Sequence, residues 1–368
     1  MFAQRFTSIV SRRYVSTVAD LYKGLINGDR GCLARSITLV ESTHHEKQQK
    51  AKELLGQVLQ ELKQRQEKQP KTPISFRIGL SGSPGAESLN DEDNNIFFLG
   101  KSTFINVFGR FLINQGHKVA VLTVDPSSST TGGSILGDKT RMLDLSREPN
   151  AYIRTSPSAG TLGGVTRTTN DAIVLCEAAG YNIILVETVG VGQSEFAVVD
   201  MVDMFCVLLP PGSGDELQGM KKGIMELVDL VIITKADGEL MPEVRRLQTD
   251  WSSALRLMRR RSPYWKPRVI SVSSRTNTGI DKSWEQMLQF ETAMIKSGEF
   301  MTKRSQQLRK WMWNNVKDRI LEQFLDDEDI KKAIQTYEER VTRGLITPFV
   351  AADAILTLFA KVKLDNNT

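Results

Sequence analysis

Short apolar segments rich in valine and isoleucine alternate with longer amphipathic stretches between residues 74 and 298. The apolar segments are Ile74–Leu80, Lys118–Val124, Asn182–Glu187, Met204–Leu209, Leu230–Thr234 and Arg268–Ser273. Helical spacing of apolar positions covers 101–116, 167–180, 216–228, 239–260 and 282–298. Strands that alternate with helices indicate parallel βαβ units, and nearly continuous apolar strands fit a sheet covered on both faces. The pattern predicts an α/β fold with a doubly wound, mostly parallel sheet.

Helical patterns flank this region on both sides. Residues 46–69 place five apolar side chains on one stripe, and two prolines end the helix. These side chains are Leu54, Leu55, Val58, Leu59 and Leu62, and the prolines are Pro70 and Pro73. The tail, 300–362, is again helical. We therefore expect an N-terminal helical extension over 20–73, a central domain over 74–298, and a C-terminal extension over 299–368 that either caps the sheet or serves self-association.

The first nineteen residues differ in composition from the rest of the chain. They contain Arg5, Arg12 and Arg13 with several serines and threonines, and the first acid is Asp20. Basic, hydroxylated, acid-free segments are typical of mitochondrial presequences, so residues 1–19 are predicted to be one; a frayed terminus is the alternative.

The chain carries a formal charge of +5, and removing the three arginines of residues 1–19 leaves it nearly neutral. We therefore expect no nucleic-acid partner, and the apolar runs are too short to predict a membrane span.

Few side chains in the sequence are typical of metal sites. Three cysteines and three histidines exclude a disulfide scaffold and a tetrahedral site built from cysteine alone.

A phosphate-binding motif follows the first predicted strand, but it is interrupted. Such a loop reads G-x-x-x-x-G-K-[ST]; its backbone N–H groups and lysine bind phosphates, and its hydroxyl binds Mg²⁺. The first half here is Gly82, Ser83, Pro84, Gly85 and Ala86, and the second is Gly100, Lys101, Ser102 and Thr103. Between them lies the thirteen-residue insert Glu87–Leu99, with four acids and no base.

Three explanations of the insert are open. The first is a gene-model or splicing error, because Ile96–Gly100 can be encoded by a pyrimidine tract ending in AG. The second is an inactive isoform, since the acids would repel a triphosphate. The third is a tolerated bulge, with Gly100–Thr103 still folding beneath the phosphate. We rank them in this order.

Two later strands end in acids, as nucleotide switches require. Asp125 is followed by the glycine- and serine-rich segment 126–142, and Glu187 is followed by Gly190. Ligands of open α/β sheets bind at the carboxyl ends of strands. Glu187 is placed to hold Mg²⁺, and the Gly190 N–H to bind the γ-phosphate. Glutamine does not directly follow Gly190, so slow intrinsic hydrolysis that a partner accelerates is expected.

The next strand predicts recognition of guanine. Thr234, Lys235, Ala236 and Asp237 form an N/T-K-x-D motif. A carboxylate there accepts hydrogen bonds from guanine N1–H and the 2-amino group, whereas adenine would leave it unpaired. A last strand is followed by Ser273, Ser274 and Arg275, where a backbone N–H often meets the guanine O6.

Four long segments resemble the ArgK/MeaB family of P-loop GTPases, including its mitochondrial members. They are 125–142, 156–173, 184–205 and 208–240. The resemblance extends from about Asp20 to Phe359. It implies a mitochondrial-matrix GTPase that binds methylmalonyl-CoA mutase, gates delivery of adenosylcobalamin, and protects or reactivates that enzyme. It also implies a homodimer built on helical extensions, with the cobalamin adenosyltransferase as a further candidate partner.

The resemblance also assigns roles to individual residues. Lys101, Asp138, Glu187 and Lys221 match catalytic positions, and Ser102, Asp125 and Glu187 match positions around the metal. Asp215 and Lys221 match a third switch that conveys nucleotide state to the mutase. Lys235 and Asp237 match the guanine-binding pair.

Three other functions are weighed against this one. A nickel-insertion GTPase would need cysteine or histidine ligands near the switches, but Cys176 and Cys206 lie in apolar patterns. A kinase acting on a transport protein would need a phospho-acceptor site and a base that the sequence does not supply. A non-catalytic scaffold that binds the mutase remains open because the insert interrupts the phosphate loop.

Overall fold

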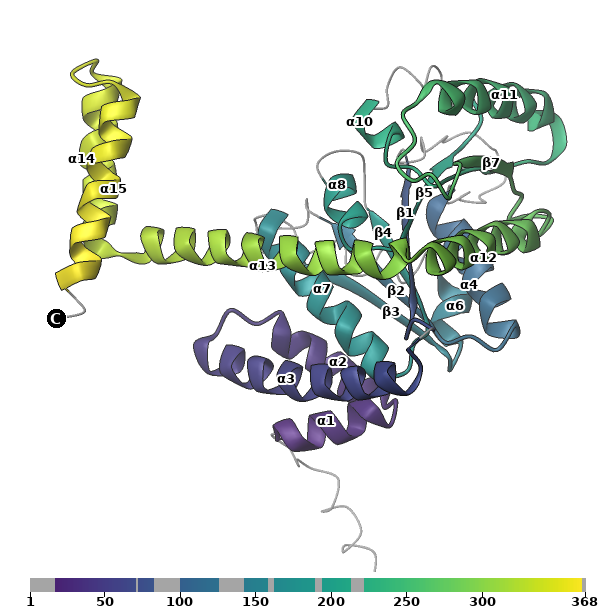
Figure 1. The fold of residues 1–368 in the computed structure, drawn as a ribbon, viewed down its shortest axis with the longest axis horizontal. Coiled ribbons are helices and arrows are strands. Elements are labelled where there is room, and N and C mark those ends of the chain that lie inside the picture. Colours follow the sequence, from purple (N-terminus) through teal and green to yellow (C-terminus); the bar gives the residue numbers. More distant parts are fainter. Residues whose placement is uncertain are drawn as a thin grey trace, which may run out of the picture. The chain divides into compact units, whose positions relative to one another are not determined.

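The computed structural model describes residues 17–70, 72–82, 100–125, 142–157, 162–188, 194–212 and 222–365 (Figure 1). The chain divides into two compact units, Met1–Ser305 and Gln306–Thr368. The boundary falls within the helix α13 (Glu299–Asp326). The larger unit contains all seven described strands, and the smaller unit is helical.

A seven-stranded sheet, parallel at every described pairing, organises the larger unit. The strand order is β3-β2-β4-β1-β5-β6-β7. The strands are β1 (Phe76–Gly82), β2 (Val119–Asp125), β3 (Ala151–Pro157), β4 (Ile183–Thr188), β5 (Met204–Leu209), β6 (Leu230–Ile233) and β7 (Arg268–Ser271). The predicted doubly wound, parallel α/β fold is confirmed.

Strand β3 is absent from the predicted strands. It pairs only with β2 and forms one edge of the sheet. Its sequence, AYIRTSP, mixes apolar residues with Arg154, Thr155 and Ser156, unlike the apolar central strands. Its place at the edge is not the reason, because the other edge strand, β7, contains Val269 and Ile270 and is among the predicted strands. Strand β3 contains one isoleucine and no valine, so it lacks the valine- and isoleucine-rich run that identified the others.

Helices cover both faces of the sheet (Figure 1). The helices of the larger unit are α1 (Val18–Ile26), α2 (Arg30–Val40), α3 (His45–Lys68), α4 (Lys101–Asn114), α6 (Leu143–Arg147), α7 (Leu162–Ala178), α8 (Ser194–Val199), α10 (Lys222–Met225), α11 (Met241–Leu257), α12 (Ile280–Ser297) and the start of α13, with the 3₁₀ turn η1 (Gly238–Leu240).

Helices α4 and α12 pack together over the central strands. There Phe104 and Phe108 stack at 5.2 Å between ring centroids, and Phe76 lies against Phe290. These aromatic rings form the core of that face.

The N-terminal helices α1, α2 and α3 pack on one another and on α7. Thr17 begins α1 with a capping box closed by Asp20. In α3 the predicted stripe is only partly buried: Leu54, Val58 and Leu62 are inside, whereas Leu59 is 54% exposed. The extension is therefore a helical layer on the domain, anchored by every third or fourth residue of α3.

A buried network of ion pairs joins the start of α13 to the amino ends of β1 and β5. Arg304 binds Asp203 in a bidentate manner, with N···O distances of 2.7 and 2.8 Å. It also donates to the Ser75 carbonyl at 2.7 Å. Arg77 pairs with Glu177 at 2.7 Å, and its backbone N–H donates to Asp203. Burial alone would raise the pKa of Asp203, but the Arg304 charge and hydrogen bonds hold it below its ordinary value.

The smaller unit consists of the rest of α13 with α14 (Glu328–Thr342) and α15 (Pro348–Asp365). Asp327 caps α14 by accepting hydrogen bonds from two backbone N–H groups. Phe324 and Phe359 pack edge to face at 5.1 Å. Many of the unit's large apolar side chains are nevertheless exposed: Leu308, Met312, Trp313, Ile320, Leu321, Leu325, Leu345, Phe349, Val350 and Leu356.

None of the helices in the described part of the chain combines the length and the apolar character that crossing a bilayer requires.

Replacing Arg304 by alanine is expected to lower the free energy of unfolding by about 3–5 kcal/mol, because it leaves the Asp203 carboxylate buried without its main partner. Urea unfolding monitored by circular dichroism measures this loss. Arg246→Ala is the matched control. It breaks an ion pair with Asp250 whose side chains are 85% and 48% exposed, so it should cost less than about 1 kcal/mol. Equal losses in the two variants would contradict the role given to the buried network.

Candidate nucleotide site

The predicted site residues that the structure describes gather at the carboxyl edge of the sheet. Strand β1 ends at Gly82, β2 at Asp125, and β4 at Glu187 and Thr188, and the segment after β6 contains Lys235 and Asp237. All these strands are parallel, so their carboxyl ends meet on one side. Ligands of open α/β sheets bind there.

Gly82 brings β1 into close contact with β5. It pairs with Leu208 in the register of the two strands. A Cβ atom at Gly82 would lie 2.2 Å from the Leu208 carbonyl oxygen. No side chain fits there without moving one of the strands, so the beginning of the predicted phosphate loop requires glycine at this position.

Lys101 lies between the ends of two adjacent strands. It begins α4, and Gly100 precedes it with a φ of 73°. Its Nζ donates hydrogen bonds to the Gly82 carbonyl at 3.3 Å and to the Thr188 carbonyl at 2.5 Å. The ammonium group and the N-terminus of α4 thus place positive charge at the end of β1, an arrangement that favours an anion.

Ser102 and Glu187 bring two oxygen donors together beside this lysine. The Ser102 hydroxyl donates to Glu187 Oε1 at 3.2 Å, and both residues are buried. Hydroxyl and carboxylate oxygens are ligands that Mg²⁺ prefers, so the donor set fits the metal that the sequence predicted.

Sequence reasoning did not identify Thr188 and Ser81 as part of this arrangement. The Thr188 hydroxyl donates to the Ser81 hydroxyl at 3.0 Å, and both are buried. This bond crosses the pair β1–β4 next to the lysine and supports its two carbonyl acceptors. Their position in the sequence could have identified them, because Ser81 directly precedes Gly82 and Thr188 directly follows Glu187.

The predicted base-recognition residues also converge. Lys235 follows β6 with a positive φ of 56°, and the Ala236 N–H donates to the Val272 carbonyl at 2.9 Å. The Ser273 hydroxyl donates to the Asp237 carboxylate. Burial lowers the pKa of Lys235, while the Asp237 charge opposes that shift. The loops after β6 and β7 are therefore tied together around one carboxylate.

The remaining predicted residues are placed less completely. Thr103 lies in the first turn of α4, and Ser274 and Arg275 follow Ser273 in the loop after β7. For Asp125 the structure describes only the strand end. The other predicted residues, and the insert 87–99, lie outside the described residues: Ser83, Pro84, Gly85, Ala86, Asp138, Gly190, Asp215 and Lys221.

The described residues contain no group of three histidine, cysteine, aspartate or glutamate side chains arranged to hold a metal ion. Cys176 and Cys206 are buried in the sheet domain, and burial raises the pKa of both thiols.

Gly82→Ala is expected to lower the free energy of unfolding by about 1–3 kcal/mol, because the new methyl group overlaps the Leu208 carbonyl. Urea denaturation measures the change. Gly56→Ala is the matched control: it lies within α3, and its Cβ would meet nothing within 4 Å. The control should gain up to about 1 kcal/mol from helix propensity. A Gly82→Ala protein as stable as the control would show that β1 and β5 do not approach as closely as described.

Comparison with known proteins identifies the family. The family model described as "Methylmalonyl Co-A mutase-associated GTPase MeaB" matches residues 33–329. The mouse "Methylmalonic aciduria type A homolog, mitochondrial" is 54% identical over 342 residues, which are 93% of this chain and 79% of the mouse protein. "GTPase ArgK" of Escherichia coli K12 is 42% identical over 333 residues, 90% of this chain and 94% of that protein.

A solved structure agrees with these sequence relatives. The "Crystal structure of LAO/AO transport system kinase" matches 96% of this chain and 100% of its own, with 32% identity and a TM-score of 0.69. The resemblance predicted from the motifs is thus confirmed. Because the family model and the relatives each cover most of its length, this chain belongs to the MeaB family of methylmalonyl-CoA mutase-associated GTPases, and it is a P-loop GTPase by sequence and by fold.

Proposed function

We propose that this GTPase is a nucleotide-dependent chaperone of methylmalonyl-CoA mutase in the mitochondrial matrix. Its GTP state gates delivery of adenosylcobalamin to the mutase and protects or reactivates that enzyme. The observation that carries the nucleotide part is the position of Lys101 between the carbonyl groups of Gly82 and Thr188 at the carboxyl edge of the sheet. The family description and the name of the mouse relative support the partner and the compartment, as does the predicted presequence over residues 1–19.

Each residue of the site has a defined task in this proposal. Lys101 offsets the negative charge on the β- and γ-phosphates. Ser102 and Glu187 would hold Mg²⁺, which supplies charge neutralisation when bound, with Asp125 at the adjoining strand end. Asp237 accepts hydrogen bonds from guanine, and the Ser273 hydroxyl orients that carboxylate. These tasks need no group from the partner enzyme, so the chain is expected to bind nucleotide on its own.

The switch residues supply the coupling to the mutase. Asp138, Gly190, Asp215 and Lys221 are assigned to segments that respond to the γ-phosphate, and Lys221 and Asp138 are assigned to hydrolysis with Lys101 and Glu187. Hydrolysis by the chain alone is slow, and the partner raises its rate.

The domain division proposed from the sequence, 20–73, 74–298 and 299–368, fits this function. The C-terminal extension is the element we propose for homodimer formation. Within the smaller unit Trp313, Ile320 and Phe349 are 55%, 55% and 81% exposed. Large apolar side chains exposed together are typical of surfaces that bind other chains. The cobalamin adenosyltransferase is a further proposed partner.

A second candidate function is a mutase-binding scaffold that does not turn over nucleotide. The sequence of the insert favours it, because Glu87, Asp91, Glu92 and Asp93 lie between the two halves of the phosphate loop. In that case the mutase would bind equally well with or without GTP.

The decisive experiment changes the nucleotide that the protein recognises. Asp237→Asn replaces the guanine acceptor by an amide that can donate to xanthine, so the variant should lose response to GTP and gain response to xanthosine triphosphate. Transfer of adenosylcobalamin to the mutase is followed by absorption spectroscopy. We expect GTP to control transfer with the wild type and xanthosine triphosphate to control it with the variant.

Asp250→Asn is the matched control. It removes one negative charge, as Asp237→Asn does, but from an exposed position on α11, so this variant should keep the response to GTP. If neither nucleotide changes the transfer of adenosylcobalamin by the wild type or by the Asp237→Asn variant, the scaffold function is favoured.

A further inference from the structure

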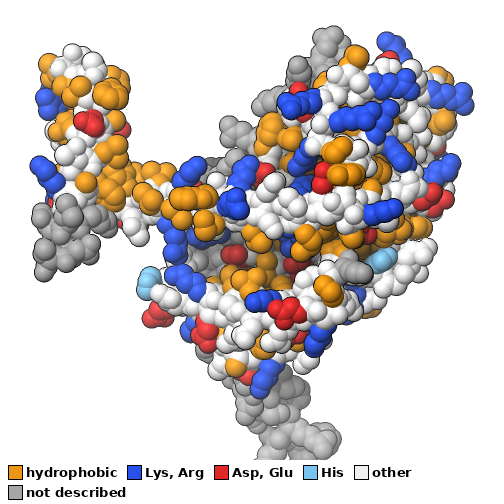
Figure 2. Space-filling model, in the orientation of Figure 1, with side chains coloured by type: hydrophobic (Ala, Val, Ile, Leu, Met, Phe, Trp, Pro, Cys, Tyr) orange, Lys and Arg blue, Asp and Glu red, His pale blue; other side chains and the backbone are white. Residues whose placement is uncertain are grey.

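A cluster of positive side chains surrounds a hollow of about 120 Å³ at the amino edge of the sheet. The hollow lies where α11 ends at Leu257, before β7 begins at Arg268 and beside the start of β6. We call its cations the basic surface; they are Arg256, Arg259, Arg260, Arg261 and Lys266. Figure 2 shows lysine and arginine side chains gathered over the region that holds α11.

Buried anchors hold the loop that carries these cations. The Trp265 Nε1–H donates to the Asp229 carbonyl at 2.9 Å, and its ring packs edge to face on Phe290 at 5.3 Å. The Ser262 hydroxyl donates to the Glu299 carboxylate at 2.5 Å. The exposed cations lie on either side of these two anchors in the sequence, so the loop is pre-organised and a ligand need not order it.

The positive charge is not neutralised within the described chain. Arg256, Arg259, Arg260 and Lys266 form no ion pair with any described residue. Two acids also line the hollow. The Asp229 carboxylate accepts a hydrogen bond from the Phe205 N–H at 2.9 Å, and burial raises its pKa. Glu226 is exposed, so five cations face two carboxylates and the hollow favours an anion.

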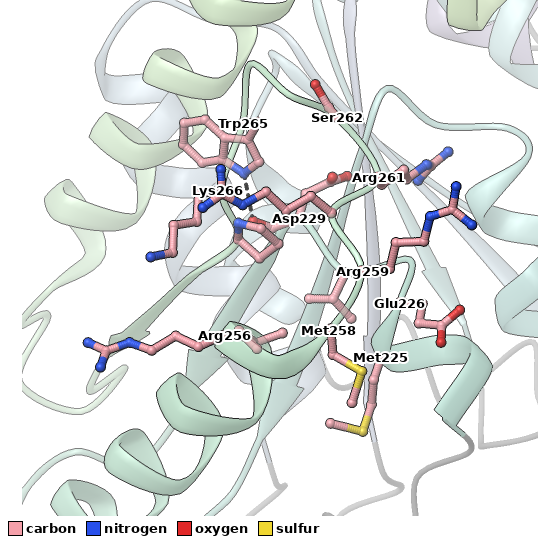
Figure 3. A pocket seen from close by; sticks show the side chains of 14 residues that line it. Met225, Glu226, Asp229, Arg256, Met258, Arg259, Arg261, Ser262, Trp265 and Lys266 are labelled. Carbon is pink, nitrogen blue, oxygen red and sulfur yellow. Dashed lines mark hydrogen bonds between the residues drawn. The ribbon is translucent and has the colours of Figure 1, made fainter.

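Helix capping accounts for only one of these cations. Positive side chains stabilise the C-terminal end of a helix, and the effect falls off beyond its last turn. Arg256 lies in the last turn of α11, but the other four cations follow the cap residue Met258. Figure 3 shows Arg256 and Lys266 extending to one side of the hollow and Arg259 and Arg261 to the other.

The surroundings favour a protein ligand. Leu257 is 87% exposed and Tyr264 is 59% exposed, next to the cations in the sequence. Arginine and aromatic side chains are enriched where proteins bind one another. A hollow admits a projecting carboxylate, whereas a membrane presents a plane of headgroups.

We propose that the basic surface docks an acidic segment of the mutase, with one or more carboxylates entering the hollow. This inference rests on the proposed function for the identity of the partner. The basic surface lies at the amino edge of the sheet and the nucleotide residues at the carboxyl edge, so docking here leaves the nucleotide site open.

Association of the full chain with the mutase, measured by biolayer interferometry over a range of salt concentrations, tests the proposal. Arg259→Gln/Arg260→Gln should lower the association rate constant about tenfold at low salt and reduce its salt dependence. Arg259→Lys/Arg260→Lys retains the charge and should restore most of the rate. Arg245→Gln/Arg246→Gln removes the same charge from exposed positions earlier on α11 and should behave like the wild type. Circular dichroism and melting temperatures confirm that each variant folds.

The possible results separate the two proposals. Wild-type protein that does not bind the mutase would overturn the proposed function. Equal binding by the wild type and the Arg259→Gln/Arg260→Gln protein would overturn only the docking surface. Phosphatidylcholine vesicles containing cardiolipin, and inorganic phosphate, are tested in parallel. Binding of either that depends on Arg259 and Arg260, without an effect on the mutase, would assign the surface to a lipid or a small anion and overturn protein docking.

Discussion

The position of Lys101 between two adjacent parallel strands is the constraint on which the nucleotide site depends. Its ammonium group reaches the carbonyl groups of Gly82 and Thr188 only because β1 and β4 are hydrogen-bonded neighbours that end at the same edge. The close approach of β1 to β5 at Gly82 fixes the start of the phosphate loop on the other side. The central strand thus positions Lys101, while Glu187 comes from β4, and β6 leads to Lys235 and Asp237.

The two edges of the sheet have different physical tasks. At the carboxyl edge lie a glycine, hydroxyl groups and single charges: Gly82, Ser102, Lys101 and Glu187. At the amino edge, Arg304 and Arg77 are buried with Asp203 and Glu177, and their mutual hydrogen bonds leave little capacity for another partner. This network attaches the start of α13 to β1, so the segment that leads into the C-terminal helices begins from a rigid position. The basic surface lies at the same edge but is exposed.

Central strands and linear motifs could be predicted from the sequence, because a fully covered strand is continuously apolar and a phosphate or guanine site needs fixed residue types at fixed spacing. Strand β3 was missed because it contains one isoleucine and no valine, whereas the other edge strand, β7, contains Val269 and Ile270. Thr188 and Ser81 were missed because their hydrogen bond joins residues 107 positions apart. Leu59 belongs to the apolar stripe predicted for residues 46–69, yet it is exposed, because how much of a stripe is buried depends on the surface that covers it. The pairing of Arg304 with Asp203 likewise depends on tertiary structure, which spacing alone does not encode.

Titration calorimetry of Mg·GTP, on this chain and on a version lacking Glu87–Leu99, tests the central claim most directly. If the strand ends alone assemble the site around Lys101, Ser102 and Asp237, the shortened protein binds GTP. Asp237→Asn in that background then weakens binding by about 100-fold, because the amide cannot accept both hydrogen bonds that guanine donates to the carboxylate. Failure of the shortened protein to bind GTP, or binding that ignores Asp237, would contradict the assignment of this edge as the GTP site.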